Sequence, residues 1–401
     1  MQNIFKFSLN NFFLITCIRI CFLIFFINCA NDIQRPPIYS LLFAGSGSER
    51  VGIISTDFAS GGRFSVLNSD LQYSVPNFVN VHSDAVLRYK NNKVYIINRL
   101  NRDNIQVLNP NFGFLTELEF GTGKGTNPQD IQILNESKAY ISLYNSRNLL
   151  VVNPGNGFII NSIDLSSFSE TSSTGSGGID GLPEMAQMFL YNGKLFLQLQ
   201  RLDKNDVSGF PAPNTHSLLL EIDTSTDKVI NAHKTPVPNP VSKIYSINLL
   251  GDDYLVMSLA GRLGFISKID GGIFLFNLRT GQFNNTPILS EAAVGGDILD
   301  FVLKSESEGY AFSLDSSFNK YIWKFNPITK EKSTLVAFYP SSLGNISGLA
   351  LSKTGKLYIG DSNFETPGVS IYDTNGTEPR KLNISPINIG LRPFDMVVLE
   401  D

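Results

Sequence analysis

Cysteine is absent from almost the whole chain. The 401 residues include three cysteines, Cys17, Cys21 and Cys29, and none lies beyond position 29. A disulfide inside a domain that follows this position is therefore excluded, and such a domain must be stable through packing alone. A folded domain without thiols also suits an oxidising compartment outside the cytoplasm.

Charged residues are scarce, and neither sign is in large excess. They make up 17% of the chain, with 32 Lys and Arg against 36 Asp and Glu. This balance excludes the strongly basic surface with which proteins bind nucleic acid or acidic lipids.

Motifs of known catalytic sites are missing as well. The three histidines, His82, His216 and His233, are not spaced as a metal-binding pair. The sequence contains no Gly-x-Ser-x-Gly nucleophile motif and no Gly-rich phosphate loop. We therefore expect a binding protein rather than an enzyme.

The abundant residues are those of a β-rich protein with many turns. The chain has 33 Gly, 30 Phe and 14 Tyr, and 42% of its residues are apolar. Aromatic side chains favour strands, Gly favours turns, and this amount of apolar material can form a large core. The composition excludes global disorder, and the length allows one large repeat fold.

One long apolar stretch, from Phe12 to Ile27, lies near the N-terminus and is interrupted by Arg19. A bilayer span needs about 20 apolar residues, so the stretch fits the hydrophobic part of an export signal better. Cys29 follows it, and residues 25–32 resemble a bacterial lipobox, in which the cysteine is lipidated and becomes the first mature residue. Asn28 stands where Gly or Ala is usual, as in the relaxed boxes of spirochaete lipoproteins.

This resemblance implies an exported lipoprotein. Residues 1–28 would be its signal, Cys29 the site of lipid attachment (palmitate or a similar chain), and residues 29–37 a lipidated cysteine and tether. The protein would then be anchored to a bacterial membrane, the outer membrane above all, at its periplasmic or surface face. The alternative is an ordinary signal peptide or an uncleaved anchor, with Cys29 incidental.

An apolar run that ends in Asn or Asp and a turn recurs along the rest of the chain. We expect these runs to be the third strands of repeated sheets, and they end at Asp57, Asn109, Asn153, Asp223, Asn277, Asn326 and Asp373. The short side chain can accept a hydrogen bond from the backbone two residues on and so start a turn. A period of about 40–50 residues with several strands in each repeat is typical of a β-propeller.

The last strand is expected to close the ring. Residues 392–399 mirror the innermost strand at 127–134, whereas the first repeat starts at Tyr39–Ala44 without such a strand. We therefore predict an all-β fold over residues 38–401, a seven-bladed propeller of four-stranded blades in which the C-terminal strand joins the first blade. Closure removes the unpaired strand edges of an open stack.

The repeat pattern, with segments such as Asn145–Asn153, resembles the YVTN/NHL-like propellers of bacterial surface and periplasmic proteins, although the YVTN tetrad itself is absent. The resemblance implies a cell-envelope binding module that recognises an envelope or host protein or a glycan. We expect a monomer that does not bind nucleic acid.

Three long loops, at 166–184, 202–215 and 260–271, cluster around the fourth and fifth blades. They predict a recognition surface there, because loops on a rigid scaffold often carry function. The alternative is that they are insertions without a function, which exposed loops tolerate.

Five arginines in or beside loops that join second and third strands could bind a carboxylate, a phosphate or an acidic sugar: Arg99, Arg102, Arg147, Arg201 and Arg262. The alternative is that they pair with local acids such as Asp103 and Asp203.

A metal site is the other candidate. Asp84, Asp130 and Asp395 occupy matching places on expected innermost strands, and carboxylates around the central channel could hold Ca²⁺, which takes 6–8 oxygen ligands. The rival function is therefore a Ca²⁺-dependent enzyme, lactonase- or lyase-like, with its site at the channel. The structural alternative is that these carboxylates accept backbone N–H groups between blades, and no other cofactor is expected.

Overall fold

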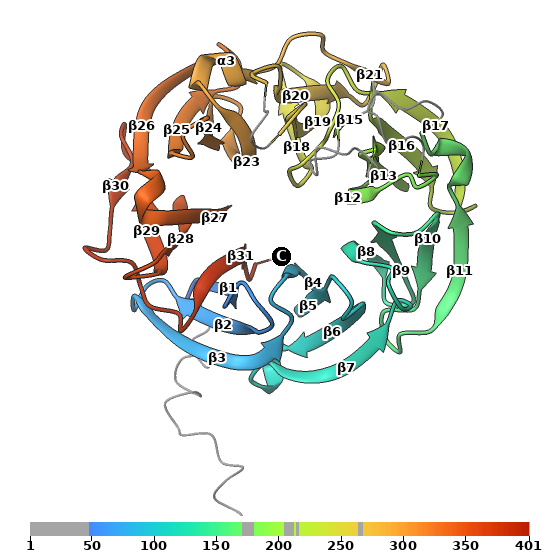
Figure 1. The fold of residues 1–401 in the computed structure, drawn as a ribbon, viewed down its shortest axis with the longest axis horizontal. Helices are drawn as coiled ribbons and strands as arrows, with labels where there is room; N and C mark the ends of the chain where they lie inside the picture. Colours follow the sequence, from blue (N-terminus) through green and yellow to red (C-terminus); the bar gives the residue numbers. More distant parts are fainter. Residues whose placement is uncertain (1–47, 171–179, 204–211, 214–215, 264–267, 401) are drawn as a thin grey trace, which may run out of the picture. The chain divides into compact units, whose positions relative to one another are not determined.

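The computed structural model describes residues 48–400 except 171–179, 204–211, 214–215 and 264–267. The predicted export signal, Cys29 and the tether lie outside the described residues. The described strands form seven blades around a ring, and this confirms the predicted all-β propeller (Figure 1). Among the described residues, no helix is long and apolar enough to cross a membrane.

Each blade is an antiparallel sheet that runs from an innermost to an outermost strand. In this order, blade 1 holds β31 (Arg392–Val398), β1 (Arg50–Thr56), β2 (Gly62–Asn68) and β3 (Tyr73–Val81); blade 2 holds β4 (Ala85–Lys90), β5 (Lys93–Asn98), β6 (Asn104–Asn109) and β7 (Leu115–Gly121); blade 3 holds β8 (Pro128–Asn135), β9 (Lys138–Leu143), β10 (Asn148–Val152) and β11 (Ile159–Asp164). Blade 4 holds β12 (Met185–Tyr191), β13 (Lys194–Leu199), β16 (Leu218–Asp223) and β17 (Lys228–Lys234); blade 5 holds β18 (Tyr245–Leu249), β19 (Asp252–Leu259), β20 (Gly272–Asn277) and β21 (Gln282–Phe283), with β22 (Leu289–Ser290) also beside β20. Blade 6 holds β23 (Asp297–Ser305), β24 (Glu308–Leu314), β25 (Lys320–Asn326) and β26 (Glu331–Tyr339); blade 7 holds β27 (Gly344–Leu351), β28 (Lys356–Asn363), β29 (Gly368–Asp373) and β30 (Arg380–Lys381).

Short elements of the described chain also stand outside this order. They are the two-strand pair β14 (Leu202–Asp203) and β15 (Ala212–Pro213), the single-turn helix α3 (Glu291–Val294) that follows β22, and the 3-10 helices η1 (Pro110–Phe112), η2 (Ser166–Phe168) and η4 (Ser341–Leu343).

Burial falls from the middle of each blade to its outer edge. In β9 and β13 every residue after the first is buried, whereas β11 and β17 are mostly exposed. The middle strands carry apolar side chains on both faces, and these pack against the neighbouring blades. The core therefore lies between the blades, and burial of these faces holds the ring together.

The turns after the third strands form as the sequence predicts. In blades 2 to 7 the terminal Asn or Asp accepts the backbone N–H two residues on, at 2.8–3.0 Å: Asn109 from Asn111, Asn153 from Gly155, Asp223 from Ser225, Asn277 from Arg279, Asn326 from Ile328 and Asp373 from Asn375.

In blade 1 the assignment of strands differs from the prediction. The run that ends at Asp57 is β1, the second strand, and the third strand is β2, which ends at Asn68. Both strands end in such a turn, because Asp57 accepts the N–H of Ala59 and Asn68 accepts the N–H of Asp70. A local motif that occurs twice in one blade could not show which strand was the third.

The C-terminal strand closes the ring, as predicted. β31 pairs antiparallel with β1, with Val398 opposite Val51 and Met396 opposite Ile53. The partner strand starts at Arg50. The Tyr39–Ala44 segment, at which the first repeat was expected to start, lies outside the described residues. Figure 1 shows the red β31 beside the blue β1.

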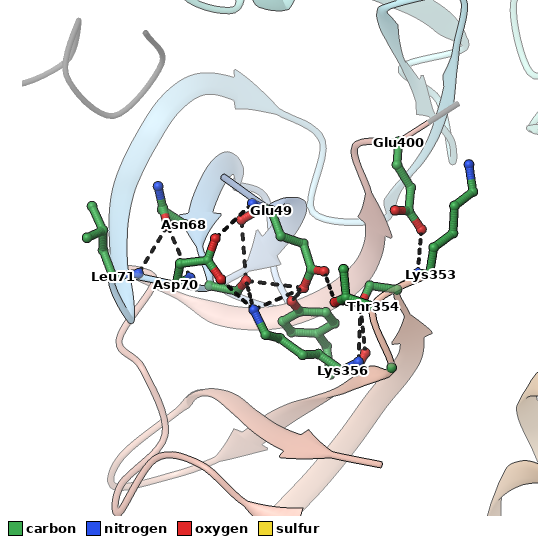
Figure 2. Close-up of polar contacts among 12 residues, drawn as sticks. Glu49, Asn68, Asp70, Leu71, Lys353, Thr354, Lys356 and Glu400 are labelled. Carbon is green, nitrogen blue, oxygen red and sulfur yellow. Dashed lines mark hydrogen bonds and ion pairs between the residues drawn. The ribbon is translucent and has the colours of Figure 1, made fainter. Parts of the chain in front are cut away.

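Polar contacts join blade 7 to the start of blade 1 at this closure (Figure 2). Lys356 on β28 forms an ion pair with Asp70 at 2.5 Å, and the hydroxyl groups of Tyr358 and Thr354 donate to the Glu49 carboxylate. The N–H of Lys353 donates to Glu400 at 2.9 Å. The two ends of the propeller sequence are therefore joined by hydrogen bonds and ion pairs as well as by strand pairing.

Candidate functional site

Three aspartates on innermost strands hold neighbouring blades together around the central channel. Asp395 accepts the N–H of Leu87 at 2.9 Å, Asp130 that of Met188 at 2.8 Å, and Asp300 that of Leu349 at 2.9 Å. Each bond runs from one innermost strand to that of the next blade.

Asp84 is not equivalent to these residues, although the sequence suggested so. It precedes the first residue of β4, and Arg99 donates to its carboxylate and carbonyl oxygens at 2.5 and 2.9 Å. Of the carboxylates expected to hold Ca²⁺, Asp130 and Asp395 lie on innermost strands, whereas Asp84 directly precedes the innermost strand β4. Asp300 is the third member that sequence reasoning missed, although it precedes an apolar residue in its strand, as Asp130 and Asp395 do.

Cationic side chains alternate with these carboxylates. Arg88 forms an ion pair with Asp130 at 2.8 Å, and Lys243 forms one with Asp395 at 2.9 Å. Burial opposes ionisation of Asp395, but Lys243 and Arg88 bring its pKa below the usual value. Burial raises the pKa of Asp300 to about 6, and Lys243 limits the rise. The wall of the channel therefore carries positive and negative side chains in nearly equal number.

A cavity of about 300 Å³ opens where these residues meet the loops that join second and third strands. Arg88, Gln187, Lys243, Asp300 and Asp395 lie on its wall. Phe58, Phe394 and Arg99 also line the cavity, and Phe58 and Arg99 belong to loops that join second and third strands. At this concave site a ligand could meet several polar groups at once.

The five predicted arginines do not converge on this cavity. Arg99 lines it, but Arg102 is exposed and 3.5 Å from Glu119, and the Arg147 Nε donates to the Gly181 carbonyl at 2.7 Å. Arg201 is buried, donating to the carbonyls of Ser169 and His216 at 3.1 and 3.3 Å. Arg262 lies between β19 and β20 in blade 5. The predicted partners of these arginines also differ, because Arg99 pairs with Asp84, and Asp103 accepts backbone N–H groups of Gly125 and Asn127.

Three aromatic rings and two guanidinium groups form a continuous series of contacts that reaches the cavity wall, and we call this series the channel-mouth ladder. Arg392 lies 4.9 Å from the ring centre of Phe364 and 5.6 Å from that of Phe58. Phe58 meets Phe394 edge-on at 6.3 Å, and Arg99 lies 5.8 Å from the ring centre of Phe394. The ladder thus runs from blade 7 through blade 1 to blade 2.

Sequence reasoning missed four of these five residues. The sequence offered one signal, because a bulky Phe58 directly follows Asp57 in a predicted turn, where small or polar residues are usual. In the structure Phe58 has a φ of 58°, in the left-handed region that Gly usually occupies. The contact of Arg392 with Phe364 had no local signal, because it depends on the closure of the ring.

A separate group of carboxylates lies before blade 4. One oxygen from each of Glu170, Asp180 and Glu184 comes within 4.8 Å of the others, and this is the group among the described residues that could hold a metal ion. Burial and the hydrogen bond to Asp180 raise the pKa of Glu170. The raised pKa favours a protonated Glu170, which lessens the repulsion between the carboxylates of this cluster. The predicted recognition surface depends on loops of which residues 171–179, 204–211, 214–215 and 264–267 lie outside the described residues.

No protein-family model matches the sequence, and no curated protein matches it. Solved structures match the fold. A candidate 6-phosphogluconolactonase from Bacteroides fragilis has a TM-score of 0.58 and 12% identity over 88% of this chain and 99% of its own. A Lactobacillus plantarum protein has a TM-score of 0.54 and 10% identity over 88% and 100%. A dihydro-heme d1 dehydrogenase has a TM-score of 0.52 and 11% identity over 87% and 74%. At such identities the likeness shows the propeller fold alone.

Proposed function

We propose that the chain is a cell-envelope lipoprotein whose propeller binds a glycan at the mouth of the central channel. Cys29 would carry the lipid, and the propeller would act as a binding module. The site proposed here lies on blades 6, 7, 1 and 2, next to the cavity, and not on the loops of blades 4 and 5.

One observation carries this proposal: bulky apolar residues are exposed in left-handed backbone on the face that holds the cavity mouth. Phe58, Leu100 and Phe318 have φ values of 58°, 42° and 62°, and 48%, 48% and 39% of their surfaces are exposed. Each lies in a loop that joins a second to a third strand, in blades 1, 2 and 6. A left-handed conformation costs an L-residue roughly 1–2 kcal/mol, and Gly or Asn would avoid this cost. Residues that weaken folding in this way point to selection for contact with a ligand.

The chemistry of the mouth favours a glycan over a protein surface. Exposed aromatic faces carry partial negative charge and attract the polarised C–H groups of a sugar ring. Gln187, Ser347 and Asp300 on the cavity wall offer donors and acceptors for hydroxyl groups. A concave pocket of about 300 Å³ fits one end of a sugar chain, whereas a protein partner needs a broad interface.

The carboxylates of the channel support the rival enzyme function less well than the mouth supports glycan binding. Asp130, Asp300 and Asp395 each accept a backbone N–H from the next blade, so these carboxylates already have a structural role. We therefore assign no catalytic step to them.

The test is capture of glycans by the purified propeller (residues 38–401) on an array that also carries peptides. We expect glycan capture, and its loss in a Phe58→Ser/Phe364→Ser double variant that retains the wild-type melting temperature. Phe158→Ser is the matched control, since Phe158 is 72% exposed beside an outermost strand and should not affect capture. Capture of peptides only, or capture that survives the double variant, would refute the proposal.

A further inference from the structure

Arg392 is held between two aromatic rings from different blades. It is the first residue of β31, opposite Thr56 of β1. Phe58 lies in the β1–β2 loop of blade 1 and Phe364 in the β28–β29 loop of blade 7, with ring centres 5.6 and 4.9 Å from the guanidinium carbon. Both distances fall within the range of a cation–π contact, about 6 Å.

Both rings are positioned by hydrogen bonds of their own turns. The N–H of Phe58 donates to the Thr56 hydroxyl at 2.9 Å, and the next residues bind the Asp57 carboxylate. On the other side, Asn363 accepts the N–H groups of Glu365 and Thr366 at 2.9 and 2.6 Å. The two loops therefore hold Phe58 and Phe364 in place, although 48% and 64% of their surfaces are exposed.

The charge of Arg392 is not neutralised within the described structure. Its neighbours around the cavity are paired: Arg88 with Asp130, Arg99 with Asp84 and Lys243 with Asp395. No ion pair involves Arg392 in the described part of the chain. No described residue accepts a hydrogen bond from its guanidinium group, so the N–H donors of that group are available to a ligand.

A fixed, planar, positively charged fork of this kind binds an oxyanion through two parallel hydrogen bonds. A carboxylate on a sugar ring supplies both the oxyanion and a C–H face that can lie against an aromatic side chain. A free phosphate supplies only the oxyanion.

We propose that Arg392 binds the carboxylate of an acidic sugar, with Phe58 and Phe364 in contact with the sugar ring. This inference rests on the proposed function and names the class of glycan that the channel mouth takes. Arg392 is a specificity residue in this scheme, because neutral sugars of the same shape would lack the group it binds.

The experiment is an NMR titration of the propeller in which the Nε–H signals of arginine are followed, with glucuronate, glucose and inorganic phosphate as probes. We expect glucuronate to shift the Arg392 signal and to bind at least about tenfold more tightly than glucose, and Arg392→Gln to abolish that preference. Arg392→Lys should restore it only partly, because Lys keeps the charge and loses the fork. Arg380→Gln is the control, since Arg380 is exposed on β30 and pairs with Asp373 at 3.5 Å.

Three results would overturn the inference: an Arg392 signal that glucuronate leaves unmoved, a preference for glucuronate that survives Arg392→Gln, or phosphate that binds as tightly as glucuronate. Its failure differs from failure of the proposed function. If the array still shows glycan capture that depends on Phe58 and Phe364 but not on Arg392, the binding function stands and the ligand is a neutral glycan.

Discussion

The hydroxyl of Tyr358 donates a hydrogen bond to the carboxylate of Glu49, so that blade 7 is joined to the residue that precedes β1 in blade 1. Tyr358 is completely buried, and burial together with this bond raises its pKa well above the usual value for tyrosine. Glu49 also lies 3.7 Å from the ammonium group of Lys356 (Figure 2). The closure thus includes a charged group that contacts residues from the other end of the sequence.

Loss of this hydroxyl should weaken the closed ring. We expect Tyr358→Phe to lower the free energy of unfolding by about 1–3 kcal/mol, because a buried carboxylate loses one donor while the ring still fills its space. Urea unfolding followed by tryptophan fluorescence measures the change. Tyr73→Phe is the control, since Tyr73 is 50% exposed on β3. Equal losses in the two variants would contradict the role given to Tyr358.

Removal of the C-terminal strand should have a much larger effect. Deletion of residues 393–401 exposes the edge of β1 and removes Met396, Val398 and Leu399, which are 1%, 7% and 8% exposed. Burial of such a side chain contributes about 1.5–3 kcal/mol, and a domain has about 5–15 kcal/mol in total. We expect an insoluble product, as judged by the fraction of protein in the supernatant after lysis.

Deletion of Glu400 and Asp401 alone is the matched control. It removes the bond to Lys353 but leaves the whole of β31 in place, so this variant should stay soluble. A soluble product with cooperative melting from the longer deletion would contradict the closure.

Glu291 should make stability depend on pH. It is completely buried, and burial raises its pKa to about 8, although the N–H groups of Gly271 and Ile298 favour the ionised form. An unfolded chain loses this proton at about pH 4.3, so the folded state alone retains it above that pH. The stabilisation is therefore complete at low pH and is lost as the pH rises towards 8.

We expect Glu291→Gln to flatten the fall in melting temperature between about pH 5 and pH 8, because Gln has no proton to lose. Glu331→Gln, at an exposed position on β26, should keep the wild-type slope. Calorimetry across this range measures both slopes. A Glu291→Gln slope equal to that of the wild type would contradict the assignment.

The anchor prediction concerns Cys29. Attached acyl chains stabilise membrane binding by about 0.8 kcal/mol per buried CH₂. We expect Cys29→Ser to leave the propeller folded, to abolish labelling by a fatty-acid analogue and to release the protein from membranes or leave an unprocessed precursor. Wild-type protein that takes up no label and partitions into water in a detergent assay would refute lipidation. It would then favour a plain secretion signal.

The sequence predicted those parts of the fold that depend on local patterns. Asn109 and Asn277 start turns through their own side chains, so a repeat of apolar runs and turns was enough to show seven blades. Prediction from the sequence failed where two strands end in the same turn motif, as at Asp57 and Asn68. It also failed where a residue lies one position outside a strand, as Asp84 does.

The candidate site was harder to predict because its residues are far apart in the chain. Phe58, Phe364 and Arg392 meet only after the ends of the propeller sequence pair. Most of the arginines predicted from their positions in loops do not line the cavity. Arg147 and Arg201, for example, donate hydrogen bonds to backbone carbonyls. The place of this candidate site therefore depends on the closure of the ring.

The most direct test of the account is hydrogen–deuterium exchange of the propeller with and without a glycan captured on the array. The account predicts slower exchange in the turns at 57–61, 99–103 and 363–366, which hold Phe58, Arg99 and Phe364, and unchanged exchange in the loops of blades 4 and 5. Slower exchange in the loops around positions 170, 202 and 262, with the three turns unaffected, would contradict a binding site at the channel mouth.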